Sequence, residues 1–246
     1  MGEKFGVPIY KTVEETLTLG TGKLAVDVKR EAKLKEIVAV SYHTLDAYGY
    51  HALEMVQCLV ERRAGGETGV KRVRCLSGEA VWRAIDAGMF DRKLLDAALK
   101  RLKHSPITRQ PKRPLRELAK APDMFVIEYR DGLKAFVLTL NGAVNEWGVD
   151  WKTTAGARTS ATFWTQEARP YMPFTYLVKG TEKMFHTGQP TWPAERTLMT
   201  GALLDALLIS KNKNGMAVPT DYLNFKYTSS WNWKQPPPPG RPSNQQ

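Results

Sequence analysis

Apolar positions along this chain recur with two periods, and these periods divide it into helices and strands. Between residues 46 and 64, apolar side chains recur at spacings of three and four, the pattern of a helix with one buried face. Between residues 70 and 76 they alternate with polar ones, the pattern of a strand with one buried face. Similar patterns predict helices over 79–87, 92–103, 174–186 and 193–211, and strands over 36–42, 157–166 and 222–227.

Two glycine turns mark the strongest strand signal. Asp131-Gly132 and Asn141-Gly142 separate three apolar, β-branched runs, 124–130, 133–140 and 143–151. Because Asp-Gly and Asn-Gly are the preferred pairs of tight hairpins, these runs are expected to form an antiparallel meander.

The two ends of the chain differ from this middle part. Thr12 and Glu15 match a capping box, which predicts a short helix between an extended 7–10 and a strand at 24–28. Residues 235–246 are rich in proline and carry no apolar anchor, so they are expected to be disordered. The predicted fold class is α+β: an open, mainly antiparallel sheet covered on one face by helices, with a short N-terminal β-α-β-like piece.

Charge is concentrated in one segment. The net charge is +11, and residues 92–120 hold ten Lys or Arg against two Asp or Glu, or +8. Such a segment could dock an anionic partner or nucleic acid, but it lacks the interleaved aromatic residues on which bases stack. Nucleic acid is therefore not the expected partner, and a solvated helix and loop is the simpler interpretation.

No targeting signal is recognised in the sequence. No apolar stretch approaches the ~20 residues of a membrane helix, and the first residues lack a secretion or transit pattern. Two cysteines, Cys58 and Cys75, fit a reducing compartment better than a disulfide framework. We expect a cytoplasmic protein without a membrane partner.

His51 is the best acid/base candidate in the sequence. Imidazole titrates near neutrality, and Asp46, one turn earlier, is the second catalytic candidate. Glu54 shares a helical face with His51 and is predicted to bind substrate. The alternative is a packed histidine that follows a helix-capping aspartate. No second His/Glu pair or zinc spacing accompanies it, so no metal site is predicted, and no glycine-rich phosphate loop is present.

Gln166 and Arg169 form a second candidate group. They follow the predicted strand 157–166 and precede Pro170, at a strand end where open sheets often present substrate contacts. We therefore predict that both bind substrate, with an ordinary polar loop as the alternative.

The order of these features resembles a known family. A helix opened by residues 48–54, the Gly65–Gly69 turn, the two hairpin turns and the helix 193–210 resemble the C-terminal domain of the glucose-fructose oxidoreductase/inositol dehydrogenase (Gfo/Idh/MocA) superfamily. The best-matching tracts are 60–70 and 192–198, and the resemblance, to a bacterial branch of that superfamily, covers about residues 36–230.

The resemblance implies an enzyme built from two domains. Members pair an NAD(P)-binding Rossmann domain with a substrate domain that oligomerises through its open sheet. Residues 1–35 then correspond to a Rossmann-like remnant, 36–234 to the substrate domain and 235–246 to the tail. In the superfamily an Asp and a His four positions apart line the active site; His51 matches the His, while the position four before it is Ala47 and the nearest acid is Asp46.

Three hypotheses follow. The first is a substrate and oligomerisation domain of an NAD(P)-dependent sugar-type oxidoreductase. It would bind no cofactor alone, would not be catalytically competent alone, and would receive NAD(P) from a separate nucleotide-binding chain. The second is a non-catalytic interaction module that docks an anionic partner through residues 92–120. The third is a structural protein that assembles as a homo-oligomer through its open sheet.

Overall fold

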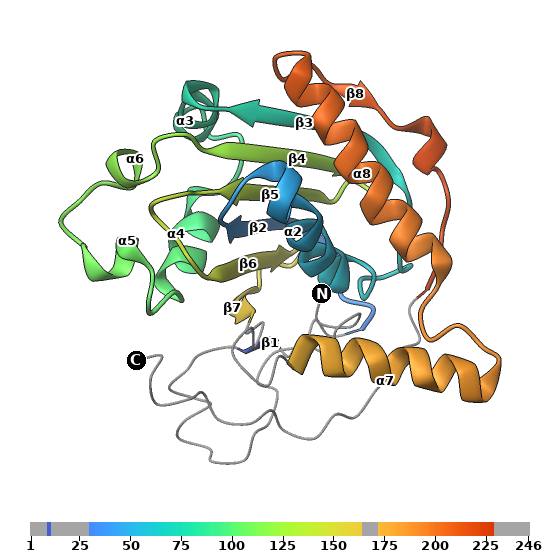
Figure 1. The fold of residues 1–246 in the computed structure, drawn as a ribbon. Helices are drawn as coiled ribbons and strands as arrows, with labels where there is room; N and C mark the ends of the chain where they lie inside the picture. Colours follow the sequence, from blue (N-terminus) through green and yellow to red (C-terminus); the bar gives the residue numbers. More distant parts are fainter. Residues whose placement is uncertain (1–8, 11–29, 164–171, 229–246) are drawn as a thin grey trace.

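The computed structural model describes residues 9–10, 30–163 and 172–228. Their strands form one open sheet in the order β1-β7-β6-β2-β5-β4-β3-β8, with helices packed against it (Figure 1). The strands are β1 (Ile9–Tyr10), β2 (Leu34–Ser41), β3 (Val70–Ser77), β4 (Asp123–Tyr129), β5 (Lys134–Thr139), β6 (Trp147–Thr153), β7 (Arg158–Phe163) and β8 (Val218–Pro219). The helices are α2 (Leu45–Val60), α3 (Glu79–Asp86), α4 (Arg92–Lys100), α5 (Pro106–Arg109), α6 (Leu115–Leu118), α7 (Met172–Thr187), α8 (Ala194–Asn212) and the 3-10 turn η1 (Asp221–Leu223). The predicted α+β class with an open, mainly antiparallel sheet is confirmed.

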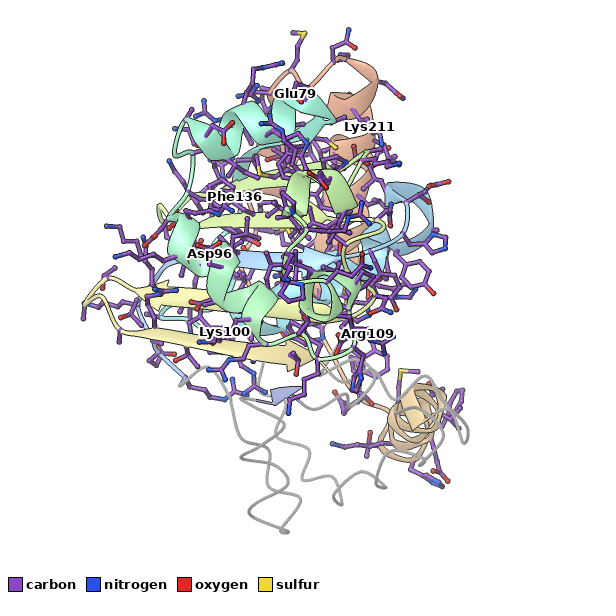
Figure 2. All side chains as sticks on the ribbon, turned by 90° about the vertical axis from the view of Figure 1, so that its left-hand side faces the viewer. Glu79, Asp96, Lys100, Arg109, Phe136 and Lys211 are labelled. Carbon is purple, nitrogen blue, oxygen red and sulfur yellow. The ribbon has the colours of Figure 1, made fainter. Side chains whose placement is uncertain are left out.

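Helices cover both faces of this sheet, which corrects the prediction of one covered face. In β2, Ile37 and Ala39 pack with α2 and α8, whereas Val38 and Val40 pack with α3 and α4 on the other face. Figure 2 shows α8, with Lys211, on one side and α4, with Asp96 and Lys100, on the other. Central strands that are apolar on both faces need cover on both. The strand at 70–76, whose alternation suggested one polar face, is β3, next to the short edge strand β8.

The predicted three-stranded meander is also corrected. β4 and β5 pair antiparallel across Asp131-Gly132 as expected, but β2 lies between β5 and β6, parallel to β5 and antiparallel to β6. The Asn141-Gly142 turn therefore crosses the end of β2 instead of closing a hairpin. The Leu140 N–H donates to the Ser41 carbonyl at 2.8 Å, which ties this crossing to the end of β2.

The chain after α8 differs from its predicted strand as well. Residues 222–227 contain the end of η1 and one isolated bridge, in which Tyr227 pairs with Glu67, while the edge strand is the short β8. Tyr222 to Tyr227 cannot continue as a strand because Leu223 turns back, its N–H donating to the Thr220 carbonyl at 2.8 Å.

The N-terminal piece is described only in part. Ile9 and Tyr10 pair antiparallel with β7, whereas the predicted helix from Thr12, the strand 24–28 and the tail 235–246 lie outside the described residues. The domain boundaries stay predictions.

Local signals set the helix ends. Asp91 caps α4 as predicted, its carboxylate accepting the Lys93 N–H at 3.0 Å. α2 stops at Val60, short of the predicted end, and the chain turns through Gly65 and Gly66 at φ +79° and +65°, which glycine tolerates best. None of the described helices is long and apolar enough to span a membrane.

Candidate functional site

Aromatic side chains meet where β2 ends, β6 begins and α2 starts. Val40 pairs with Gly148, so the residues after β2 lie beside Trp147. The Tyr48 ring stacks on Trp147, with centroids 5.7 Å apart and planes inclined by 16°, and Tyr42 lies 4.9 Å from the same indole. With the two histidines described next, these three residues form what we term the aromatic cluster: Tyr42, His43, Tyr48, His51 and Trp147.

His51 lies in this cluster. Its imidazole meets Tyr48 edge to face, with ring centroids 5.6 Å apart and planes inclined by 70°. The side chain is partly exposed on the first half of α2. The sequence-predicted acid/base candidate is thus held by an aromatic neighbour while part of it reaches solvent.

His43 is a second imidazole of the cluster, and the sequence reasoning missed it. Its ring stacks on Tyr48 at 4.6 Å and 16°, so Tyr48 contacts both histidines. His43 has φ +71°, which is uncommon for a residue with a side chain. Asn141 holds this backbone from both sides: its Nδ2 donates to the His43 carbonyl at 3.0 Å, and the His43 N–H donates to its Oδ1. The available signal was a histidine directly after the buried strand 36–42.

Trp147 adds a buried polar atom to the cluster. Its indole N–H is shielded from solvent and has no hydrogen-bond acceptor among the residues that the structure describes. The ring also lines a small cavity, about large enough for one water molecule, with Ser41, Met55 and Phe163. A buried donor without a partner is unfavourable, so an oxygen atom brought to it would be bound.

Asp46 is not brought to His51. It is exposed in the first turn of α2, where the Thr44 hydroxyl and then its own N–H hold the pKa of its carboxyl below the usual value. Five residues at 100° each place Asp46 roughly 140° around the helix from His51. The two side chains therefore leave α2 in different directions.

Glu54 is placed away from the cluster, in a buried network between α2 and α8. Its Oε2 lies 3.3 Å from Arg196 Nη2, and its Oε1 accepts the Thr200 hydroxyl at 2.6 Å. Arg196 also pairs with Glu61, which accepts the Tyr227 hydroxyl at 3.0 Å. Glu54 has no exposed surface, so its role is to join the two helices.

One guanidinium, that of Arg196, faces the carboxylates of both Glu54 and Glu61 in this network. Burial alone would lower the pKa of Arg196, but the carboxylates of Glu61 and Glu54 hold it well above its usual value. Burial, followed by the field of Glu61, raises the pKa of Tyr227, so its hydroxyl stays protonated and donates. Such a network fixes one arrangement of helices more than it adds net stability.

Gln166 and Arg169 lie outside the described residues. The described chain before them ends with β7 at Phe163, which pairs with Trp147. The described chain therefore reaches the end of β7 beside the aromatic cluster.

A second buried carboxylate lies under α4. Asp150 of β6 accepts Arg158 Nη2 at 3.1 Å through Oδ2, while its Oδ1 has no donor among the described residues. Arg101, which follows the last residue of α4, lies nearby and donates to Ser160, the residue paired with Asp150 across the strands, at 2.8 Å. Burial raises the pKa of Asp150 to about 6, although Arg158 opposes this shift.

The described residues do not fit a dinucleotide. A pyrophosphate binds where a helix N-terminus offers free N–H groups and positive dipole. Four helices whose starts are described instead place a carboxylate there: Asp46 in α2, Glu79 in α3, Asp91 at the cap of α4 and Glu195 in α8. The residues that the structure describes contain no group of three His, Cys, Asp or Glu that could hold a metal ion.

Three of the ten basic side chains in segment 92–120 are paired with carboxylates of the same chain. Arg92 pairs with Asp96 at 2.9 Å, and Arg113 pairs with Glu117 at 3.8 Å. Arg116 pairs with Glu79 and lies over the Trp82 ring at 5.6 Å. The interaction-module hypothesis is not favoured, because arginines already paired give little free charge to a partner.

Comparison with known proteins finds likeness only at the level of structure. No family model matches the sequence, and no curated protein matches it. A myo-inositol dehydrogenase from Corynebacterium glutamicum matches over 77% of this chain, at 10% identity and a TM-score of 0.44. GenD2 from gentamicin A biosynthesis, solved with NAD, matches over 82% of this chain at 11% identity and 0.49. WlbA from Bordetella pertussis, solved with NADH and UDP-GlcNAcA, matches over 87% at 13% identity and 0.42.

These are Gfo/Idh/MocA-type dehydrogenases, as the sequence resemblance predicted. The matches cover 57%, 60% and 62% of the three dehydrogenase chains, so this chain spans less than two thirds of their length. The likeness concerns the course of the chain, and function has to be argued from the residues themselves.

Proposed function

We propose that this chain is the substrate-binding and assembly half of an NAD(P)-dependent oxidoreductase that acts on a sugar or cyclic polyol. The observation that carries the proposal is Tyr48, whose ring contacts the imidazoles of both His43 and His51. An aromatic cluster that carries two imidazoles suits a ring that is apolar on its faces and hydroxylated at its rim.

The proposed chemistry assigns one task to each group. His51, whose imidazole can both accept and donate a proton, would exchange the proton of the reacting hydroxyl or carbonyl oxygen. The buried N–H of Trp147 would donate to a second oxygen of the ligand, and Gln166 and Arg169 would contact the ligand from the adjoining segment.

In this proposal the cofactor is bound by another chain. The carboxylates at the described helix starts oppose a pyrophosphate, so NAD(P) would be supplied by a separate nucleotide-binding chain. Alone, this chain would bind ligand without transferring hydride. A cytoplasmic location, where NAD(P) is plentiful, belongs to the same proposal.

The test uses the four histidines as reporters. Two lie in the aromatic cluster, and the other two, His104 and His186, lie outside it and serve as internal controls. The imidazole NMR signals are followed while myo-inositol or glucose is added to the full chain. Saturable shifts of His43 and His51 alone support the proposal, and Tyr48→Ala is expected to abolish them. Equal shifts of all four signals, or none with either probe, would refute it.

A cofactor titration separates the two halves of the proposal. NADH and NADPH are added to the chain while tryptophan quenching is measured, and no saturable binding is expected. If a nucleotide-binding chain restores turnover, His51→Ala should abolish it while His104→Ala retains it. Full turnover in His51→Ala would reject the acid/base role.

A further inference from the structure

Two large apolar side chains lie on one side of helix α7 and are exposed to solvent. Val178 and Phe185 expose 64% and 79% of their surfaces. Seven residues at 100° each bring them to within about 20° of one another, on one side of the helix. The described contact of α7 with the following turn is at Gly180, roughly 160° around from Val178, where Thr191 Oγ1 donates to the Gly180 carbonyl at 2.5 Å. We call Val178 and Phe185 the α7 face; in Figure 1, α7 lies below the sheet and α8.

Helix α8 carries a second uncovered apolar surface. Leu198 and Ile209, 58% and 36% exposed, are eleven residues apart and therefore share one side of the helix, with Ala202 and Asp205 between them. Tyr222 of η1, 58% exposed, lies close enough to Asp205 to feel its charge. We call Leu198, Ala202, Ile209 and Tyr222 the α8 stripe.

Neither surface is covered by the other within one chain, although only residues 188–193 separate the two helices. Isolated helices of about this length are marginal in water, and their stability comes from burying an apolar face. The sheet offers no bare face to a partner in its described part, because α2 and α8 cover one side and α3 and α4 the other.

We propose that two copies of this chain associate by exchanging α7, with the α7 face of each copy seated on the α8 stripe of the other. A twofold arrangement forms this contact twice and covers all four surfaces at once. An aromatic side chain buries about 150–250 Å², so the two Phe185 and two Tyr222 rings, at their exposed fractions, supply roughly 500 Å². That is about a third of a standard interface of ~1,600 Å², before the aliphatic residues are added.

The first test is the mass of the full chain in solution, by sedimentation equilibrium over ~1–100 µM. The wild type is expected to be a dimer. Phe185→Glu and Leu198→Glu, one on each surface, should each weaken the dimer by at least ~100-fold, because every dimer would bury the new charge twice. Met216→Glu is the matched control, since Met216 is 63% exposed but lies in the turn after α8. All three positions are exposed, so unchanged thermal melting verifies folding.

A mixing experiment tests the geometry. Val178→Cys chains and Ala202→Cys chains are oxidised separately and together; a disulfide dimer that forms only in the mixture supports the exchange. The native cysteines are buried and do not compete. Three results would overturn the proposal. The wild type could be a monomer at every concentration, the dimer could tolerate either glutamate substitution, or Met216→Glu could dissociate the dimer as readily as Phe185→Glu and Leu198→Glu do. A nucleotide-binding chain as the true occupant of the stripe gives the first of these results.

Discussion

Replacing Asp150 by Asn should remove a loss of stability that occurs as the pH rises from about 4 to about 6. The folded carboxyl has a pKa of about 6 against a usual 3.8, because burial disfavours its charged form. The folded state therefore holds this proton more tightly than the unfolded state. Stability from this group is greatest at low pH, falls as the pH rises from about 4 to about 6, and is constant above that range.

The magnitude follows from the two pKa values. Ionised Asp150 destabilises the fold by about 3 kcal/mol at pH 8 and by about 2 kcal/mol at pH 5, relative to a neutral side chain. Asparagine has nearly the same shape, stays neutral and still offers Arg158 an acceptor. The difference in unfolding free energy, variant minus wild type, should thus become more positive by about 1 kcal/mol between pH 5 and pH 8.

The assay is urea unfolding of both proteins at the two pH values. Asp96→Asn is the control, because Asp96 also pairs with an arginine but is largely exposed on α4. Its effect should be the same at both pH values. A difference for Asp150→Asn that stays constant within a few tenths of a kcal/mol would refute the reasoning that burial governs this carboxyl.

Three further predictions concern other parts of the fold. The backbone of His43 lies in the left-handed region, so His43→Gly should be more stable than His43→Ala by about 1 kcal/mol in urea unfolding. Equal stabilities would contradict backbone strain at this residue. An added Cβ at Gly148 would lie 2.8 Å from the Ala98 carbonyl oxygen, so Gly148→Ala should lower the unfolding free energy by about 1–3 kcal/mol. Gly201→Ala, in open space on α8, should instead raise it by about 0.5–1 kcal/mol; the opposite order would show that α4 is loosely packed. Arg196→Met removes the arginine that pairs with two buried glutamates and should lower the unfolding free energy by about 3–5 kcal/mol; a neutral result would mean that the network is dispensable.

The sequence predicted local structure well because local signals decide it. The capping Asp91, the Asp131-Gly132 hairpin and the periodicity of α2 each act within a few residues, and the structure follows them. The predicted three-stranded meander was wrong because Asn-Gly favours a turn without specifying which strand lies beside it. The insertion of β2 between β5 and β6 depends on apolar side chains far apart in the sequence, which a local pattern does not report.

The same distinction applies to the candidate site. His51 was found because a histidine among aromatic residues on a helix is visible in the sequence. His43 was missed because its importance arises from a left-handed backbone held by Asn141, 98 positions away. Glu54 shares a helical face with His51 by spacing, yet Arg196 and Thr200 of α8 enclose it. Spacing along one helix does not reveal what the next helix places against it.

The position of β2 also bears on how the chain folds as it leaves the ribosome. β2 is the earliest long strand described, yet both of its neighbours are synthesised much later: Ile37 pairs with Ala135 and Trp151, 98 and 114 positions on. Its strand edges therefore remain unpaired for about a hundred residues of synthesis, roughly 5–20 seconds at ~5–20 residues per second. Such long-range pairing slows folding and leaves strand edges open to aggregation. Protection of nascent β2 by chaperones should thus matter more for the yield of this protein than the stability of its finished fold.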